Sequence, residues 1–411
     1  MPVKQASGRR VPPRPGGTGA HEHDGVGTAR MRSSRRLSGQ LISRNEEPAL
    51  SAPRPSTTAG QATSRRHLYM ELTKARLSAL VVVTAAVGFL LGSPDRVDWV
   101  LVAGETLRHL SGLEFFEAFA LLGAAFGRID WWVFGWTIIG TGLAAGGTNG
   151  LNQWVEADRD ALMHRTSGRP LPSGAMTRNE ALLSCVGMVL IGFVLLLEMA
   201  NPLAAFLAIL TCAIYVLIYT PLKTRSTLNT LVGAVCGAIP PMIGWAAASG
   251  ELGFGAWLLA AVLFIWQLPH FLALAWMYRE DYERGGYRML PIVDRSGVLT
   301  GQIAVLTSLL LIPLGFMFFL EQVTGMLFII GAFGLGLWLS KAGFALYVQR
   351  TNESARRLFM ASIIYLPIVL ILMVIDQQGL TPGQLMAMPP ELGPESGLES
   401  GEVLFSALRS E

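Results

Sequence analysis

The stretch NGLNQWVEADRDALMHRTSGRPLPSG, residues Asn149–Gly174, begins where an apolar run of membrane-spanning length ends. Three of its polar residues recur at every fourth position: Asn152, Glu156 and Asp160. In an α-helix this spacing places the three side chains in one stripe about 12 Å long. Carboxylate and amide oxygens are the ligands that hard cations such as Mg²⁺ prefer. The stretch therefore predicts a helix that leaves a membrane through a cation-binding face; the alternative is a solvated helix end with i,i+4 ion pairs.

The composition indicates a polytopic membrane protein. Of the 411 residues, 51% are hydrophobic and only 15% are charged, with a mean hydropathy of +0.44. Soluble domains carry about 25% charged residues, so an ordinary soluble enzyme and a disordered chain are both excluded. Apolar segments close to the twenty residues that span a bilayer recur nine times. They predict an all-α bundle with spans near 77–93, 131–151, 180–199, 202–220, 230–248, 254–276, 299–319, 325–347 and 357–375.

Charge in the loops predicts the orientation. The loops after the second, fourth, sixth and eighth spans are rich in Arg, whereas those after the third, fifth and seventh contain Glu198, Glu251 and Glu321 but no Lys or Arg. Residues 1–66 carry twelve Lys and Arg against four Asp and Glu. The positive-inside rule therefore places the N-terminus in the cytoplasm and the acidic tail, 377–411, outside.

Three regions lie outside the predicted spans. Residues 1–66 are rich in Arg, Pro, Ser and Gly, which predicts a disordered basic extension of a protein in a bacterial inner membrane. The Arg- and Ser-rich stretch Met31–Arg44 leaves a mitochondrial presequence, and with it the mitochondrial inner membrane, as the alternative. The tail 377–411 is predicted to be disordered. Within the domain 67–376, residues 94–130 are predicted to form an external insertion with an interfacial amphipathic helix in Leu113–Gly127.

The loops on the inner side combine acids with cations. Arg165 and Arg169 follow the acidic stripe, Lys223 and Arg225 follow the fourth span, and Asp281 follows the sixth. Carboxylates that hold Mg²⁺, together with Lys and Arg that neutralise phosphate oxygens, are what a metal-bridged diphosphate requires. Because the site would open into apolar helices, we expect a polyprenyl diphosphate. The small residues of Gly140–Gly150 and Gly233–Gly250 either shape this cavity or serve close helix packing.

Three segments carry a resemblance to a known family: NQWVEADRDALMHRTSGRPLPSG (152–174), YTPLKTRSTLNTLVGAVCGAIPPMIGW (219–245) and LPHFLALAWMYREDYERGGYRMLP (268–291). They resemble the intramembrane prenyltransferases of the UbiA type, and within that family the branch that farnesylates protoheme IX. The resemblance covers the chain from about Glu71 to Asp376. It departs from the general family pattern in two places. Glu156 stands where most members have Asp, and the second acidic motif retains only Asp281.

The resemblance implies a fold of nine transmembrane helices and a reaction. Farnesyl diphosphate and heme b are the implied substrates, and water addition at the alkylated vinyl group gives heme O, which serves terminal oxidases directly or as the precursor of heme A. Heme A synthase or an oxidase assembly complex is an implied partner, besides the lipid bilayer, and no nucleic acid is expected. The implied Mg²⁺ ligands and catalytic residues are Asn152, Glu156, Asp160 and Asp281, and the implied diphosphate-binding residues are Arg165, Arg169, Lys223 and Arg225.

Two histidines and two further functions stay open at this point. His270 is a candidate for a heme contact or for a structural hydrogen bond at a helix break, and His164 is a candidate for a propionate or diphosphate contact. The alternatives to heme farnesylation are prenylation of a quinone or chlorin precursor and, without catalysis, heme handling by a transporter or assembly factor. Acids and arginines confined to one side of the membrane favour an enzyme, because an ion pathway would place charges near the middle of the bilayer.

Overall fold

The computed structural model describes residues 64–379 and 381–387. The expectations for residues 1–63 and 388–411 lie outside this range. Within it the chain is helical, and Thr324 and Gln377 form one isolated β-bridge. The helices are α1 (Arg65–Leu72), α2 (Ala75–Gly92), α3 (Trp99–Ser111), α4 (Phe115–Phe126), α5 (Trp131–Asp160), α6 (Arg178–Met199), α7 (Pro202–Ala213), the π-helix η1 (Ile214–Tyr219), α8 (Thr220–Leu222), α9 (Asn229–Ser249), α10 (Phe254–Met277), α11 (Arg279–Arg284), α12 (Leu290–Val293), α13 (Val298–Leu320), α14 (Met326–Gln349), α15 (Asn352–Ile375) and α16 (Pro382–Ala387).

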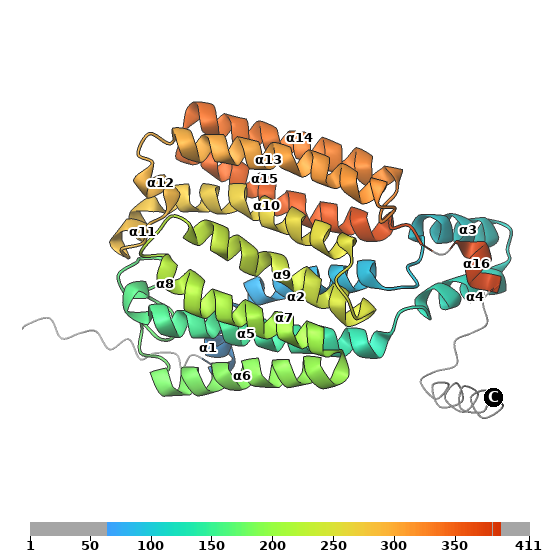
Figure 1. Ribbon diagram of the computed structural model, residues 1–411, viewed down its shortest axis with the longest axis horizontal. Coiled ribbons are helices and arrows are strands. Elements are labelled where there is room, and N and C mark those ends of the chain that lie inside the picture. The colour runs from blue at the N-terminus through green and yellow to red at the C-terminus, as the bar shows by residue number, and fades with distance from the viewer. Residues whose placement is uncertain (1–63, 380, 388–411) are drawn as a thin grey trace, which may run out of the picture. The chain divides into compact units, whose positions relative to one another are not determined.

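The long helices form a membrane bundle (Figure 1). In the described part of the chain, eight helical stretches are long and apolar enough to cross a bilayer: α2, α6, α7 continued through η1 and α8, α9, α10, α13, α14 and α15. Each overlaps one predicted span. The one predicted span that none of these eight overlaps is 131–151, the second along the chain. It falls on α5, which has 30 residues but is not among the eight. Its Thr, Gly and Asn residues lower its hydropathy, and these residues face other helices and the cavity described below. The count of nine is therefore approximate.

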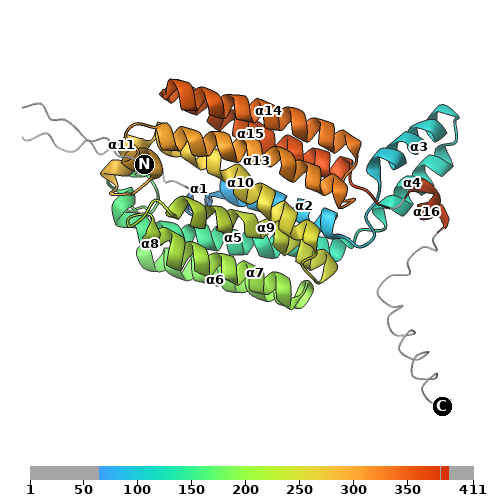
Figure 2. The ribbon, with the colours of Figure 1, turned by 45° about the horizontal axis from the view of Figure 1, so that its top comes forward.

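Small residues bring α2 and α9 into backbone contact. A Cβ added at Gly88 would lie 1.9 Å from the carbonyl oxygen of Pro241, and one at Gly244 would lie 1.8 Å from that of Ala85. The two helices run side by side in both ribbon views (Figures 1 and 2). Lipid tails are as apolar as the side chains, so the hydrophobic effect does not drive helices together inside the bilayer. Van der Waals contacts made at this close approach stabilise the helix pair instead. Gly244 of α9 thus serves helix packing, whereas Gly233 and Gly237 line the cavity described below.

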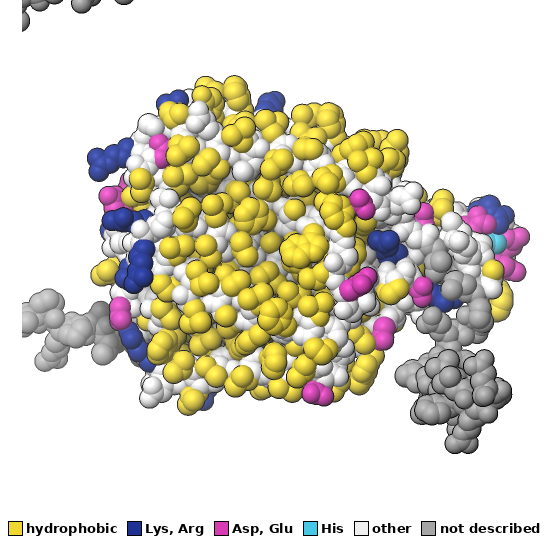
Figure 3. Space-filling model, in the orientation of Figure 1, with side chains coloured by type: hydrophobic (Ala, Val, Ile, Leu, Met, Phe, Trp, Pro, Cys, Tyr) yellow, Lys and Arg dark blue, Asp and Glu magenta, His cyan; other side chains and the backbone are white. Residues whose placement is uncertain are grey.

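The surface of the bundle agrees with a membrane environment. Apolar side chains cover its flank, and Lys and Arg side chains gather at the end where α11 and α12 lie (Figure 3). Exposed apolar residues such as Leu183, Ile330 and Leu306 are 65–73% accessible. Because water would penalise this surface, it is suited to contact with lipid tails.

The predicted insertion contains two helices. A helix, α4, lies within Leu113–Gly127, and α3 precedes it in an antiparallel arrangement (Figure 2). The interfacial position of α4 stays a prediction. Asp98 caps α3 by accepting a hydrogen bond from the backbone N–H of Leu101. The start of the predicted tail is also ordered in the described residues: the backbone N–H of Gln378 donates to Val323, and α16 packs against α3 and α4.

Candidate active site

A cavity of about 320 Å³ lies between α2, α5, α7, η1, α9 and α10. One end is lined by charged residues from the last turns of α5 and from the loops that follow α5 and α8. The other end is lined by apolar residues such as Ala144, Ala208 and Ile243. Binding cavities for small molecules are commonly about 300–1,000 Å³ in volume and mostly apolar, with a few placed polar groups. This cavity therefore suits a ligand with an anionic head and an apolar chain.

The acidic stripe predicted from the sequence is one buried face of α5. Asn152, Glu156 and Asp160 are 0%, 5% and 1% exposed. The helix starts at Trp131 with Asp130 as its N-cap, and no proline interrupts its register over 30 residues. Two carboxylates and an amide are thus held in line on a rigid element rather than on a mobile helix end. The alternative of a solvated helix end is excluded by this burial.

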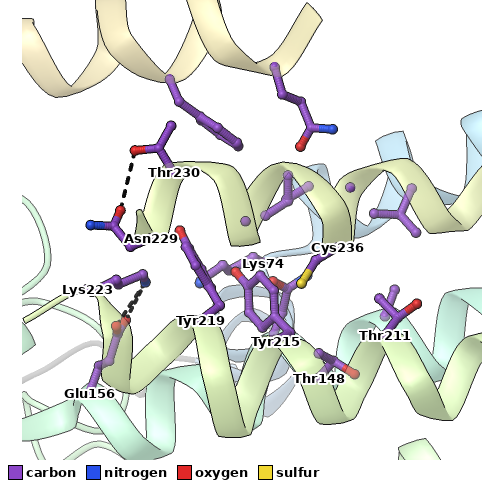
Figure 4. Close-up of a pocket in the computed structure, with 18 of the residues that line it drawn as sticks. Lys74, Thr148, Glu156, Thr211, Tyr215, Tyr219, Lys223, Asn229, Thr230 and Cys236 are labelled. Carbon is purple, nitrogen blue, oxygen red and sulfur yellow. Dashed lines mark hydrogen bonds and ion pairs between the residues drawn. The ribbon is translucent and has the colours of Figure 1, made fainter. Parts of the chain in front are cut away.

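Each member of the stripe is bound to a polar or basic side chain from another part of the fold. Asn152 Oδ1 accepts a hydrogen bond from Lys74 Nζ at 2.8 Å, and Asn152 Nδ2 donates to Thr220 Oγ1 at 3.0 Å. Lys223 Nζ lies 2.8 Å from Oε1 of Glu156. Figure 4 shows this last pair at the mouth of the cavity. The Glu156 carboxylate and the Lys223 ammonium therefore neutralise each other.

The third pair closes the inner end of the stripe. Arg169 Nη1 lies 2.7 Å from Oδ2 of Asp160, and the backbone carbonyl of Asp160 accepts a hydrogen bond from Thr166. The loop that carries Arg169 is thereby folded back onto the helix from which it emerges. Asp160 is almost completely buried, so the guanidinium supplies the compensating charge that a buried carboxylate needs.

Lys74 is a site residue that the sequence reasoning missed. It is the N-cap of α2 and has a left-handed backbone (φ 47°, ψ 55°), which is uncommon for a residue with a side chain. This conformation marks a constrained position, and the Nζ reaches Asn152 from it. Burial, together with the nearby charges of Arg169 and Lys223, lowers the pKa of Lys74 to about 7, against the opposing effect of the Glu156 and Asp160 carboxylates. In the sequence Lys74 looks like any basic residue flanking the first span, so no local signal distinguishes it.

Lys223 lies in an aromatic enclosure. Its Nζ is 4.5 Å from the centre of the Tyr219 ring and 5.8 Å from that of Tyr287. Burial opposes the charged form, but the Glu156 carboxylate holds the pKa of Lys223 above its ordinary value. Burial also raises the pKa of the Tyr287 hydroxyl. Lys223 is therefore a permanent cation at the mouth of the cavity.

Tyr215 and Tyr219 belong to η1, the π-helical segment of the fourth span. Their ring centres are 4.9 Å apart, and both line the cavity. A π-helical turn changes the register of side chains along a helix and is frequent at functional sites. Here it directs two aromatic rings into the same cavity (Figure 4).

The loop after α10 approaches the site from the opposite side. Asp281 accepts hydrogen bonds from the Arg284 side chain and from the backbone N–H of Arg165, the latter at 3.4 Å. Partial burial opposes ionisation, but the bond from Arg284 and those from the Arg165 backbone keep the pKa of Asp281 below its ordinary value. Arg165 lines the cavity and lies over the rings of Tyr278 and Tyr282 at 5.1 Å and 5.6 Å. Asp281 itself is not a cavity-lining residue in this state; Tyr282 is.

Three other candidates lie outside the cavity. Arg225 and His164 are exposed, and neither lines it. The Nδ1 of His270 lies 2.9 Å from the Ser362 hydroxyl, and its ring stacks on Trp266 and Phe359. His270 thus makes a structural hydrogen bond, but the predicted helix break is absent, because α10 continues through Pro269.

The residues of the stripe fit Mg²⁺ in combination with a phosphate ligand. In the described ranges no cluster of three or more His, Cys, Asp or Glu residues forms an all-protein metal site. Mg²⁺ is usually bound by one or two carboxylates and keeps waters or substrate phosphates as its other ligands. Glu156 and Asp160 line the cavity and are such donors, whereas Asn152 is fully buried behind them, bonded to Lys74 and Thr220, and does not line it.

This fold and this site define an intramembrane prenyltransferase. Residues 115–364 match the model of the UbiA prenyltransferase family, and the chain belongs to that family. It is 41% identical over 312 residues to the protoheme IX farnesyltransferase of Solibacter usitatus (strain Ellin6076), which covers 76% of this chain and 99% of the relative. It is 37% identical over 303 residues to the mitochondrial protoheme IX farnesyltransferase of Homo sapiens, covering 74% and 60% of the two chains.

Two solved structures share the fold. A structure described for digeranylgeranylglyceryl phosphate synthase has a TM-score of 0.58 at 17% identity, covering 75% of this chain and 97% of that one. The apo structure of a UbiA homolog from Aeropyrum pernix K1 has a TM-score of 0.51 at 17% identity, covering 72% and 98%. At this identity the likeness concerns the fold alone.

Proposed function

We propose that this chain transfers the farnesyl group of farnesyl diphosphate to a vinyl group of protoheme IX and adds water to give heme O. The observation that carries the proposal is the set of three bound polar groups at the mouth of an apolar cavity, in a chain whose relatives are protoheme IX farnesyltransferases. A diphosphate would bind at the charged end and the isoprenoid chain would occupy the apolar end. Heme O would pass to a terminal oxidase, or to heme A synthase as a partner.

The diphosphate would be bound by the basic residues of the cavity wall. Lys74, Arg165, Arg169 and Lys223 all line the cavity and come from three separate segments of the chain, because Arg165 and Arg169 share the loop after α5. Guanidinium groups pair with phosphate oxygens through two parallel hydrogen bonds, and ammonium groups act as point charges. Arg225, which is exposed here, would attract the diphosphate at long range or bind it after a loop movement.

Asn152, Glu156 and Asp160 would hold Mg²⁺, with Asp281 completing the set from the opposite loop. Mg²⁺ bound there would neutralise charge on the diphosphate oxygens and so improve the leaving group. Asp281 would first have to exchange its hydrogen bond with Arg284. The Lys and Arg side chains released from the acidic stripe would then be free for the diphosphate.

The remaining chemistry follows from the cavity wall. The C1–O bond of the substrate breaks heterolytically, and its electron pair goes to the diphosphate held by the cations. The rings of Tyr215 and Tyr219 present electron-rich faces to the allylic cation. The vinyl π electrons then form the bond to C1. Packed helices keep bulk water from the cation before it reacts. Such a path requires no enzyme nucleophile.

The test is heme extraction and chromatography from bacteria that lack a heme O synthase and express this chain, either intact or as Asp160→Ala. We expect heme O, or heme A made from it, only with the intact chain. Heme b alone, from a well-expressed and membrane-inserted protein, would refute the proposed substrate, and prenylated quinone or chlorin precursors would be sought next. We further propose a bacterial inner membrane with the charged end of the bundle on the cytoplasmic side.

A further inference from the structure

A second set of polar atoms lies deeper in the cavity than the charged pairs Lys223–Glu156 and Arg169–Asp160. Tyr215 and Asn149 both line it. The Asn149 side-chain nitrogen donates to Ser78 Oγ at 3.1 Å, but within the described part of the chain neither its Oδ1 nor the Tyr215 hydroxyl has a hydrogen-bond partner. Asn149 is only 5% exposed. Tyr215 is half-buried, and its hydroxyl and Asn149 Oδ1 can both be satisfied by a small polar ligand in the cavity.

Their depth can be fixed relative to the charged pairs. The hydrogen bond from Asn152 to Thr220 brings α5 and α8 level with each other at the mouth. Asn149 precedes Asn152 by three residues, and Tyr215 precedes Thr220 by five, and both helices run towards the mouth. At about 1.5 Å per residue, the two unpartnered atoms therefore lie about one to one and a half turns deeper than the charged groups.

Of the threonine hydroxyls at this level, that of Thr211 donates to the backbone carbonyl of Leu207 at 2.7 Å. The Thr141 hydroxyl is unpartnered and lines the same cavity. It precedes Asn149 by eight residues in α5 and therefore lies about 12 Å deeper, farther from the mouth. In the described cavity wall, free hydrogen-bonding capacity also remains at the Tyr287 hydroxyl, whose ring lies beside Lys223 at the mouth; Tyr215 and Asn149 supply it about one turn deeper.

We infer that Tyr215 and Asn149 hold the water molecule that becomes the hydroxyl group of the product, an inference that rests on the proposed function. When C1 of the farnesyl group bonds to the terminal vinyl carbon, the positive charge passes to the carbon attached to the porphyrin ring. That carbon is two bonds from C1, and C1 has just left a diphosphate held at the level of Asn152. Because the isoprenoid chain would occupy the apolar end of the cavity, C1 would lie on the side of the charged groups that faces the two polar atoms, and the cation would form near them.

The two side chains have the right chemistry for this water. Asn149 Oδ1 accepts a hydrogen bond from one O–H of the water. The Tyr215 hydroxyl accepts a hydrogen bond from the other O–H or donates one to the water oxygen, and a lone pair of that oxygen remains free to attack the cation. The oxygen–carbon bond forms, and the excess proton leaves to the departing diphosphate. A cation that meets no positioned water instead loses a proton from the adjacent methylene. The product is then an alkene lighter than heme O by the mass of one water.

The ratio of the two products tests the inference. The full-length wild-type protein, Tyr215→Phe, Asn149→Ala and the control Thr141→Val are reconstituted in lipid nanodiscs with farnesyl diphosphate, heme b and Mg²⁺. Hydroxylated and dehydrated farnesyl-hemes are separated by liquid chromatography and identified by mass, and released diphosphate is measured in parallel. We expect the ratio of dehydrated to hydroxylated product to rise at least tenfold in Tyr215→Phe and Asn149→Ala, and to stay at the wild-type value in Thr141→Val.

Three results would overturn the inference. The first is a wild-type product ratio in Tyr215→Phe, whose ring keeps the shape of the cavity wall. The second is a loss of diphosphate release in that variant, because the residue would then act before the cation forms. The third is an equal rise of the product ratio in Thr141→Val, which would mean that the removal of any polar group from the cavity wall excludes water from the cavity. If the wild-type protein makes neither farnesyl-heme, the proposed function itself is wrong.

Discussion

The Nζ of Lys223 lies between the two carboxylate oxygens of Glu156, at 2.8 Å and 3.1 Å. The ammonium comes from the loop after α8 and the carboxylate from the last turns of α5, and their side chains are 11% and 6% exposed. A pair so buried gains little net stability, because desolvation of both charges offsets their attraction. We therefore interpret the pair as functional: Glu156 would exchange Lys223 for Mg²⁺, and Lys223 would exchange Glu156 for the diphosphate.

Replacing both partners by apolar residues tests this interpretation. Glu156→Gln or Lys223→Met alone leaves one buried charge without its partner, and we expect each to lower the free energy of unfolding by about 3–5 kcal/mol. In the double variant Glu156→Leu/Lys223→Met the loss should shrink to about 1 kcal/mol, while farnesyl transfer stays at least 100-fold below wild type. Thermal unfolding in detergent and product formation are measured on all three variants. Recovery of activity along with stability would contradict the functional role.

Binding of Mg²⁺ and of diphosphate should be strongly coupled. Either ligand alone breaks ion pairs and leaves one partner of each pair without a counter-charge, whereas both together supply each freed group with an opposite charge. We expect inorganic pyrophosphate to bind at least tenfold more tightly with Mg²⁺ present, and Mg²⁺ to gain the same factor from pyrophosphate. Isothermal titration calorimetry in both orders measures the two factors. Tight binding of Mg²⁺ alone would show instead a preformed metal site.

The bundle could be predicted from the sequence because lipid solvation imposes a simple rule. A span must be a helix of about twenty apolar residues, so hydropathy alone located α2, α6, α9 and the other lipid-facing helices to within a few residues. α5 is the instructive exception. Its polar residues lower its hydropathy, and it was located by apolar runs at one end and by the Asn152–Asp160 spacing at the other. The two-helix form of 94–130 was only half predicted, because α3 is too polar to register as an apolar run.

The acidic stripe was equally accessible, since i, i+4, i+8 spacing fixes a helix face without knowledge of its neighbours. The partners of the stripe were not. Lys74 and Asn152 are far apart in the sequence, and only the fold brings Nζ and Oδ1 to 2.8 Å. The roles of Tyr215 and Tyr219 depend on the π-helical turn, which has no reliable sequence signal. Arg225 has the residue type and loop expected of a diphosphate ligand, but its side chain is exposed.

The contact between α2 and α9 should not tolerate even one added methyl group. In Gly88→Ala or Gly244→Ala the new Cβ meets a backbone carbonyl at less than 2 Å, so the helices must separate. We expect a cost of about 1–3 kcal/mol or more in the free energy of unfolding, and lower activity, because both helices line the cavity. Gly187→Ala in α6 is the control, since nothing lies within 4 Å of its Cβ. An unchanged unfolding midpoint in Gly244→Ala would refute the close approach.

Lys74 should make diphosphate binding depend on pH near neutrality. Its pKa of about 7 means that the ammonium is charged below this pH and becomes neutral above it. The charged form attracts diphosphate, so kcat/KM for farnesyl diphosphate should contain a component that falls up to tenfold between pH 6 and pH 8, with a midpoint near 7. In Lys74→Arg this component should vanish, because guanidinium stays charged throughout. Titration of the diphosphate itself affects both proteins equally, so the ratio of wild-type to variant kcat/KM isolates the enzyme group. A ratio that does not change with pH would mean that Lys74 is charged throughout this range, or that it does not touch the diphosphate. A direct binding titration of inorganic pyrophosphate to Lys74→Met separates these two cases, since only a lysine that contacts the diphosphate weakens binding when it is removed.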